Sequence, residues 1–542
     1  MKILAMGEVV SVKKTVIVIF ILLLGFVLRS FSMDFPSIGY HNMKENEYLS
    51  MAQEMIRTKD FVNRRIYFYN AFEKNPVMKL YPQPPLVSYQ ILLSWKLLGD
   101  NLWGPRLFNV LFGIAGIVVM YLIARLLFQE TRYVLFCAFL LALMPLGVFF
   151  SRNLQPESPA FFFMLLAHFF YLKFVTGLKK YNLFLGGVLF SIAWLYKFSF
   201  LFGLLPFIFC LPVKALWNKK REILKYIAVF FISYLPIIIA IVWLRHVGQW
   251  EFDARENLNR IRLFEVFSFS YWNRYGHAIW QYIYAENYTL LFSLLALTGI
   301  IIALRKRKGL LNRYIIGWAF TIIPYSMVFS DFINQHSYYQ MPFLGLVCIA
   351  SVYATIYIFE HIKRLSKNYV FFIILITLVS IPSIFLSITR MYRCVFLGED
   401  VAGESLREFT SSDEHIFILT HCQGYGVARY AQRYAGWPAT LEEFKEKEER
   451  FKMRYICIYP AEYSEGLKVN RPLYDYILNN YHLKEVGLIK NMSAYNAVYT
   501  IYEKGKAGPD IDNLLHSYRD KIALRKVYTL LGRHFDFYTL RL

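Results

Sequence analysis

The chain has 542 residues, of which 57% are hydrophobic and only 18% are charged, and its mean hydropathy is +0.36. Ordinary soluble domains carry roughly 45–50% apolar and about 25% charged residues, so this composition excludes a soluble globular protein. The net charge of +22 comes largely from Lys and Arg in short loops between apolar blocks. That pattern is typical of a membrane topology signal, and we therefore expect no nucleic-acid partner.

Apolar blocks recur along the first 390 residues, and most are long enough for a helix to cross a hydrocarbon core of about 30 Å. They predict about eleven transmembrane helices, near residues 15–33, 104–127, 132–150, 159–176, 181–197, 198–213, 225–244, 288–304, 313–330, 340–359 and 369–388. The basic segments all fall on one side of the membrane in this arrangement: the N-terminus and residues 173–182, 214–225, 305–313 and 360–368.

By the positive-inside rule, the side that carries the basic segments is cytoplasmic. The sequence thus predicts a multi-pass protein of the cell membrane with a cytoplasmic N-terminus and an extracytoplasmic C-terminal part. The alternative for residues 1–33 is a cleaved signal peptide, because Ser30 and Ser32 form a weak small-x-small ending. Cleavage would not change which loops are external.

Unusual polar residues concentrate on the predicted external side, in the loops at 34–103, 150–158, 245–287 and 330–340 and at the outer end of the fifth span. Carboxylates there can act as a base or hold a metal, and cations can neutralise a phosphate. Such a cluster suits a substrate whose polar head is handled at the outer boundary while its tail stays in lipid. The residues are Glu45, Glu47, Arg152, Glu157, Lys197, His336, Tyr338 and Tyr339.

Each of these groups also has a purely structural interpretation. Glu45 and Glu47 suit the first turn of an amphipathic helix, where acids complement the helix dipole. Glu157 precedes Ser158-Pro159, a plausible helix start. Lys197 can extend to lipid head groups, and residues 336–339 suit an aromatic belt. The functional interpretation is favoured over the structural one, because a topology derived without these residues places all of them on the outer side.

The motifs resemble, in order and over roughly residues 1–390, the GT-C glycosyltransferases of the protein-O-mannosyltransferase and aminoarabinose-transferase type. The segment "HNMKENE" (41–47) is similar to the acidic motif of their first external loop, and two registers are open: one places the catalytic acid at Glu47, which we favour, and the other at Glu45. Gln83 in "YPQPPLVSY" stands where the family often has Lys or His. "SRNLQPESPAFFF" (151–163), "LYKFSF" and "HSYYQMPFLG" (336–345) match further family segments, with Glu157 as the second acid and Lys197 as the family lysine.

The resemblance implies transfer of a hexose or pentose from a polyprenyl-phosphate carrier to a hydroxyl of a lipid, protein or glycan acceptor, with inversion at the outer face. Glu47 or Glu45 would be the general base. The donor would be held by Lys197, Arg152, Arg64, Arg65, His336, Tyr338, Tyr339 and Gln83. We predict no resident cofactor beyond this donor. A divalent metal held by Glu47 and Glu157 stays open, because the family includes metal-assisted and metal-free members.

Two other functions are alternatives. An oligosaccharyltransferase of the same fold would carry Trp-Trp-Asp-x-Gly, and this pentapeptide does not occur in the sequence. A multi-pass transporter or flippase, which belongs to a different class, would place charges in mid-span or use paired broken helices. The predicted spans are nearly free of charge at their centres.

The predicted fold is an all-α polytopic membrane domain of GT-C type over residues 1–389, including the first external loop, followed by a small α/β domain over residues 390–505. In that domain we predict strands at 415–420, 454–460 and 496–504 and helices at 403–410, 440–451 and 471–481. Residues 506–542 are predicted as a basic amphipathic helical tail. The aromatic loop at 245–287 is predicted to hold interfacial helices. One disulfide among Cys394, Cys422 and Cys457 stays open.

Overall fold

The computed structural model describes residues 12–68, 84–219, 222–247, 263–361, 369–420, 424–438, 440–467, 470–491, 494–505 and 517–542. The chain forms two compact units. Unit 1 comprises Met1–Met33, Trp103–Leu244 and Phe252–Arg390, and unit 2 comprises Asp34–Leu102, Arg245–Glu251 and Met391–Leu542. The first external loop, which we predicted as part of the membrane domain, thus belongs to the same compact unit as the C-terminal domain.

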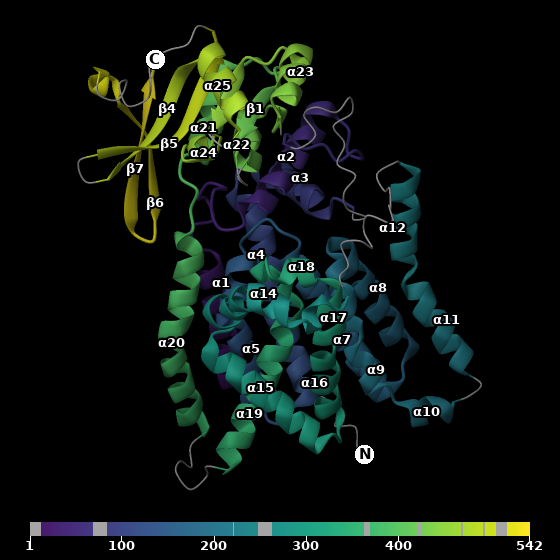
Figure 1. Cartoon of the computed structure of the whole chain (residues 1–542). Coiled ribbons are helices and arrows are strands. Elements are labelled where there is room, and N and C mark those ends of the chain that lie inside the picture. The colour runs from purple at the N-terminus through teal and green to yellow at the C-terminus, as the bar shows by residue number, and fades with distance from the viewer. Residues whose placement is uncertain are drawn as a thin grey trace. The chain divides into compact units, whose positions relative to one another are not determined.

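Unit 1 is built from helices (Figure 1). They are α1 (Val12–Arg29), α4 (Trp103–Leu127), α5 (Thr131–Leu143), α6 (Pro145–Phe150), α7 (Glu157–Gly177), α8 (Lys180–Tyr196), η1 (Phe198–Leu204), α9 (Pro206–Cys210), α10 (Val213–Trp217), α11 (Ile223–Ser233), α12 (Leu235–His246), η3 (Glu265–Phe267), α14 (Phe269–Gln281), η4 (Tyr282–Asn287), α15 (Leu290–Lys306), α16 (Leu310–Phe320), α17 (Ile322–Val328), α18 (Ser330–Ile333), η5 (Ser337–Phe343), α19 (Leu344–His361) and α20 (Tyr369–Arg393).

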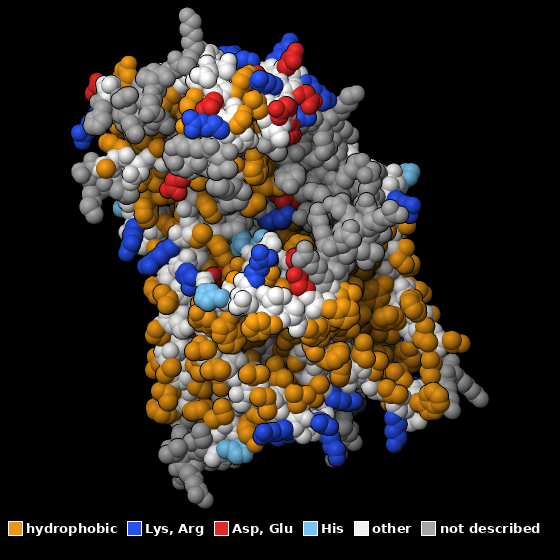
Figure 2. Space-filling view, in the orientation of Figure 1, with side chains coloured by type: hydrophobic (Ala, Val, Ile, Leu, Met, Phe, Trp, Pro, Cys, Tyr) orange, Lys and Arg blue, Asp and Glu red, His pale blue; other side chains and the backbone are white. Residues whose placement is uncertain are grey.

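All eleven predicted spans fall on helical segments, but the number eleven is not confirmed. Within the described residues, five helices are long and apolar enough to cross a membrane, and the pair of α14–η4 and α15, bent by 103°, would be a sixth if it forms one span. Other predicted spans are interrupted; α5, for example, ends at Leu143 because Pro145 starts a new helix. Figure 2 shows hydrophobic side chains covering the outer surface of these helices, as lipid contact requires.

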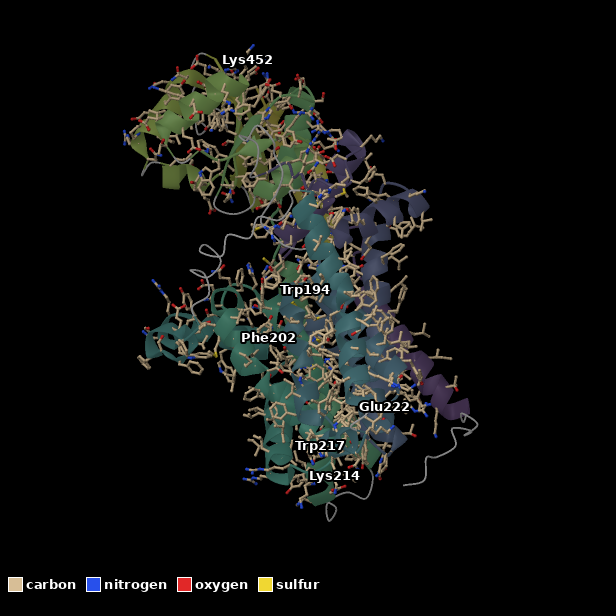
Figure 3. The ribbon with its side chains drawn as sticks, turned by 90° about the vertical axis from the view of Figure 1, so that its right-hand side faces the viewer. Trp194, Phe202, Lys214, Trp217, Glu222 and Lys452 are labelled. Carbon is tan, nitrogen blue, oxygen red and sulfur yellow. The ribbon has the colours of Figure 1, made fainter. Side chains whose placement is uncertain are left out.

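The segment that follows α8 is not a continuous α-helix. After Lys197 the chain continues as the 3-10 helix η1, and in Figure 3 the labelled residues Lys214 and Trp217 lie below Trp194 and Phe202. Backbone groups inside a membrane must find protein partners.

His168 of α7 provides one such partner. Its Nε2 donates to the carbonyl of Gly203 at 2.8 Å, and its Nδ1 accepts from the hydroxyl of Tyr314 at 2.6 Å. The buried histidine therefore stabilises the 3-10 helix η1, which follows Lys197.

Unit 2 combines two helices of the first external loop with an α/β domain (Figure 1). Its strands form one seven-stranded sheet in the order β2-β1-β3-β5-β4-β7-β6, parallel between β2, β1 and β3 and antiparallel elsewhere. The elements are α2 (Asn42–Thr58), α3 (Leu86–Leu98), α21 (Glu399–Phe409), β1 (Ile416–Leu419), α22 (Gly424–Ala431), β2 (Ala435–Gly436), α23 (Leu441–Phe451), β3 (Tyr455–Ile458), α24 (Tyr463–Leu467), α25 (Arg471–Asn480), β4 (Tyr481–Asn491), β5 (Ala494–Lys504), η6 (Arg519–Lys521), β6 (Ala523–Leu530) and β7 (Arg533–Arg541).

The strands and helices predicted for the α/β domain correspond to β1, β3, β5, α21, α23 and α25. The helix predicted for the C-terminal tail is wrong, because β6 and β7 form an antiparallel hairpin that completes the sheet. Leu531 and Gly532, at its turn, both have positive φ angles, 52° and 71°, as a tight two-residue hairpin turn requires. Cys394 and Cys457 are free thiols, and Cys422 lies outside the described residues.

The first external loop is joined to the sheet by main-chain contacts. Phe68 pairs with Ala435 in a parallel bridge, and the Ala435 N–H donates to the carbonyl of Tyr67 at 2.7 Å. Met51 and Met55 of α2 pack with Ile66 in a small apolar core. The loop is therefore held by the same hydrophobic and main-chain interactions that stabilise the domain.

Candidate active site

Helix α2 carries the two candidate bases of the first external loop. Residues two apart on a helix point in different directions, so Glu45 and Glu47 have different neighbours. Glu45 accepts a hydrogen bond from the hydroxyl of Ser37. Glu47 accepts from the ammonium of Lys44, one turn earlier, at 2.7 Å. Both glutamates are buried within the unit.

A second cation lies near Glu47. Arg64 is only 3% exposed. Its burial lowers the pKa of its guanidinium to about 10, and the negative charge of Glu47 opposes this shift. The neighbouring Arg65 instead pairs with Asp60, with 3.5 Å between Nη2 and Oδ2. Arg64 thus interacts electrostatically with the candidate base, and Arg65 forms an ion pair with Asp60.

Unit 1 holds a second group of predicted residues, and here five of them come together. Glu157, at the first turn of α7, forms a buried ion pair with Lys197, at the end of α8. The Lys197 ammonium also lies over the rings of Tyr338 and Tyr339, at 4.4 and 4.2 Å from their centroids. His336 stacks on Tyr338 with 5.0 Å between the ring centroids. These five residues, an acid, a lysine, a histidine and two tyrosines, thus lie together in this unit.

Arg152 contacts the chain segment that follows α1. It is buried, and its Nη1 donates to the carbonyl of Ser32 at 2.6 Å, just beyond the end of α1. This bond satisfies a carbonyl at the end of a membrane helix. Gln83 lies outside the described residues. The sequence analysis did not identify Lys44 as a neighbour of Glu47. Its i,i+3 spacing on the helix could have predicted the contact.

The described residues do not provide a metal centre. Among them, no group of three or more His, Cys, Asp or Glu side chains could hold a metal ion. Glu157 is engaged by Lys197 and Glu47 by Lys44. The carboxylates considered for a metal thus each have an ammonium partner, and no reaction step is assigned to a metal here.

Comparisons with known proteins show which proteins this chain resembles. The sequence profile of the dolichyl-phosphate-mannose-protein mannosyltransferase family matches residues 82–245. The undecaprenyl phosphate-alpha-4-amino-4-deoxy-L-arabinose arabinosyl transferase of Pseudomonas aeruginosa is 29% identical over 218 residues, which cover 38% of this chain and 37% of that protein. The chain thus aligns with well under half the length of this relative.

Solved structures match over most of the chain. ArnT from Cupriavidus metallidurans has a TM-score of 0.54 at 15% sequence identity, covering 92% of this chain and 99% of that one. The same protein bound to undecaprenyl phosphate has a TM-score of 0.52. The oligosaccharyltransferase of Archaeoglobus fulgidus has a TM-score of 0.56 at 13% identity, covering 90% and 74% of the two chains. At such low identity these matches define the fold alone, and that fold extends through both units.

Proposed function

We propose that this chain is a membrane glycosyltransferase of the GT-C type; the family-profile match, the aminoarabinose-transferase relative and the shared fold support the proposal. It moves a sugar from a polyprenyl-phosphate donor to a hydroxyl of a lipid, protein or glycan acceptor. We assign the reaction to the outer face of the membrane, which follows from the positive-inside topology of the sequence.

The observation that carries this proposal is the environment of Lys197. A buried lysine at the end of a membrane helix is costly and marks a functional site. Here the ammonium is held in place by Glu157 and by the faces of Tyr338 and Tyr339. Lysine binds phosphate as a point charge, and a preorganised cation stabilises the charge that develops on a departing phosphate. We assign Lys197 to the donor phosphate, with His336 in support.

Glu47 is the proposed general base. It removes the proton of the acceptor hydroxyl while the hydroxyl oxygen attacks the anomeric carbon from the face opposite the phosphate. The bond between that carbon and the phosphate oxygen breaks, the polyprenyl phosphate leaves with the electron pair, and the configuration inverts. Lys44 pairs with the Glu47 carboxylate, and the charge of Glu47 acts on the buried Arg64, so two cations interact with the proposed base. The bond from Ser37 to Glu45 supports a structural role for Glu45.

The test uses the purified full chain with a panel of radiolabelled undecaprenyl-phosphate monosaccharides and host membrane lipids as acceptors. Release of undecaprenyl phosphate reports turnover for any sugar in the panel. We expect Glu47→Gln to lower kcat by about 100- to 10,000-fold, the usual contribution of a general base. Binding of tritiated undecaprenyl phosphate should stay within about twofold of the wild-type value, because that ligand carries no acceptor hydroxyl.

Glu45→Gln is the matched control, since it makes the same chemical change two residues away in the same helix. An inactive Glu45→Gln with an active Glu47→Gln would transfer the base assignment to Glu45. A wild-type chain that neither turns over any donor nor binds undecaprenyl phosphate would overturn the proposed function itself.

A further inference from the structure

The chain segment that leads into α2 is held by the C-terminal domain. Gly39 pairs with Val395 in an antiparallel bridge. The Phe396 N–H donates to the carbonyl of Ile38 at 2.7 Å, and the Ser37 N–H donates to the hydroxyl of Tyr430 at 2.9 Å. Residues 37–39 thus contact both the segment before α21 and the helix α22, more than 350 positions later in the chain.

A buried side-chain contact continues this junction into α2 itself. Glu399, the first residue of α21, accepts hydrogen bonds from the side-chain amide of Asn42, the first residue of α2, and from the Gly426 N–H at 3.0 Å. Its side chain is fully buried. A Cβ at Gly426 would overlap the Glu399 carboxyl group, so the glycine allows α22 to approach it. Glu399 therefore links α2, α21 and α22.

The far end of α2 has a second link to the domain. The hydroxyl of Tyr434 donates to Glu54 at 2.6 Å, and Arg57 donates to the same carboxylate through two nitrogens at 2.6 and 2.8 Å. Glu47 lies between Asn42 and Glu54 on the helix. Contacts at both ends fix the direction and the rotation of α2, and hence where its side chains point.

We propose that Glu399 is a positioning residue for the reaction: through Asn42 it sets the rotation of α2 and so the direction of the Glu47 carboxylate. This inference rests on the proposed role of Glu47 as the base. Burial and the charge of Asp400 raise the pKa of Glu399 well above its usual range, whereas Arg429 opposes that shift. A protonated carboxyl has the shape and charge of a glutamine amide, so Gln is the conservative replacement.

Two substitutions separate positioning from general stability. Glu399→Leu removes the acceptor for Asn42 and for Gly426, and Glu399→Gln keeps a polar group of the same size. Glu485→Leu is the matched control, because Glu485 is equally buried in β4 and accepts from Tyr499 and Arg541 at 2.6 Å, and among the described residues it makes no bond to the first external loop. If Glu399→Leu does not fold, Asn42→Ala breaks the same bond from the α2 side.

Hydrogen exchange of the α2 amides measures the position of the helix without reference to activity. We expect faster exchange at residues 42–47 in Glu399→Leu and unchanged exchange there in Glu485→Leu and in Glu399→Gln. In the transfer assay we expect kcat of Glu399→Leu to fall about 100-fold, the effect of a misplacement near 1 Å. The KM for the donor should stay within about twofold, and Glu399→Gln should keep kcat within about threefold.

Unchanged α2 exchange in Glu399→Leu would overturn the inference, as would a kcat equal to that of the wild type. A folded Glu399→Gln that is as slow as Glu399→Leu would also overturn it, because the conservative variant must restore the function. Failure of the proposed function gives a different result: Glu47→Gln remains active whatever happens at Glu399.

Discussion

The ion pair between Glu157 and Lys197 offers the sharpest test of unit 1, through a double-mutant cycle with Lys197→Met and Glu157→Gln. The side chain of Lys197 is 9% exposed and that of Glu157 is 1% exposed. Removing one partner of a buried pair leaves the other charge without compensation, which typically costs about 3–5 kcal/mol. Lys197→Met also loses contact with the faces of Tyr338 and Tyr339, and each such contact contributes up to about 2 kcal/mol when it is desolvated.

Lys197→Met alone should therefore lower the free energy of unfolding by at least about 3 kcal/mol, a change of more than 100-fold in the unfolding equilibrium. The double variant has no buried charge, so we expect it to recover most of the loss that arises from Glu157. SDS-induced unfolding in mixed micelles measures all four corners of the cycle. Both variants that lack Lys197 should bind undecaprenyl phosphate more weakly than the wild type, whereas Glu157→Gln should retain binding.

The separation between stability and binding is the decisive result. A coupling energy within about 0.5 kcal/mol of zero would mean that the two side chains act independently, and the buried pair would not exist in the folded protein. Tight undecaprenyl phosphate binding by the double variant would refute the assignment of Lys197 to the phosphate.

Three further predictions concern residues outside that pair. His168→Leu leaves the carbonyl of Gly203 without its side-chain donor and should lower the free energy of unfolding by about 1–3 kcal/mol, measured by thermal unfolding in detergent, whereas His168→Gln should lose less. Gly299→Ala places a methyl group against the backbone of α19 and should lower stability by about 1–3 kcal/mol or more, whereas Gly116→Ala, with open space at its Cβ, should change it little. The pKa of Glu399 is raised in the folded protein. The free energy of unfolding of the wild type should therefore fall relative to that of Glu399→Gln as pH rises above about 4.5, by up to about 1.4 kcal/mol per pH unit. Parallel plots of unfolding free energy against pH for the two proteins would contradict this.

The helical unit could be predicted from the sequence because its signal is local. A run of apolar residues must form a helix in lipid, where no other backbone structure satisfies its own hydrogen bonds within one segment. The number of spans could not be predicted in the same way. The segments on either side of Met144, and those on either side of Lys197, could form one membrane crossing or two. The outcome depends on how the break at a proline or at a 3-10 helix is stabilised. The stabilising partner, as with His168, comes from another helix.

The different directions of Glu45 and Glu47 could be predicted from the helical periodicity of the sequence. Helix formation over residues 42–58 places Glu45 and Glu47 on different faces, so the choice between the two registers was already a choice between two environments. The sequence did not show which face meets Ser37 and which meets Arg64, because those neighbours depend on tertiary packing. The C-terminal hairpin was missed for a related reason. Its turn is Leu-Gly rather than Asn-Gly, and β7 pairs with β4 as well as with β6.

The grouping of the first external loop with the C-terminal domain follows from contacts that no local pattern contains. Gly39 meets Val395, and Asn42 meets Glu399, across more than 350 residues of chain. Two chemical tasks are thereby assigned to different folding units: the candidate phosphate cation to the membrane helices, and the candidate base to the unit that contains the sheet. Substitutions that loosen the sheet should act on kcat, and substitutions near Lys197 on donor affinity, because each group is held by the packing of its own unit.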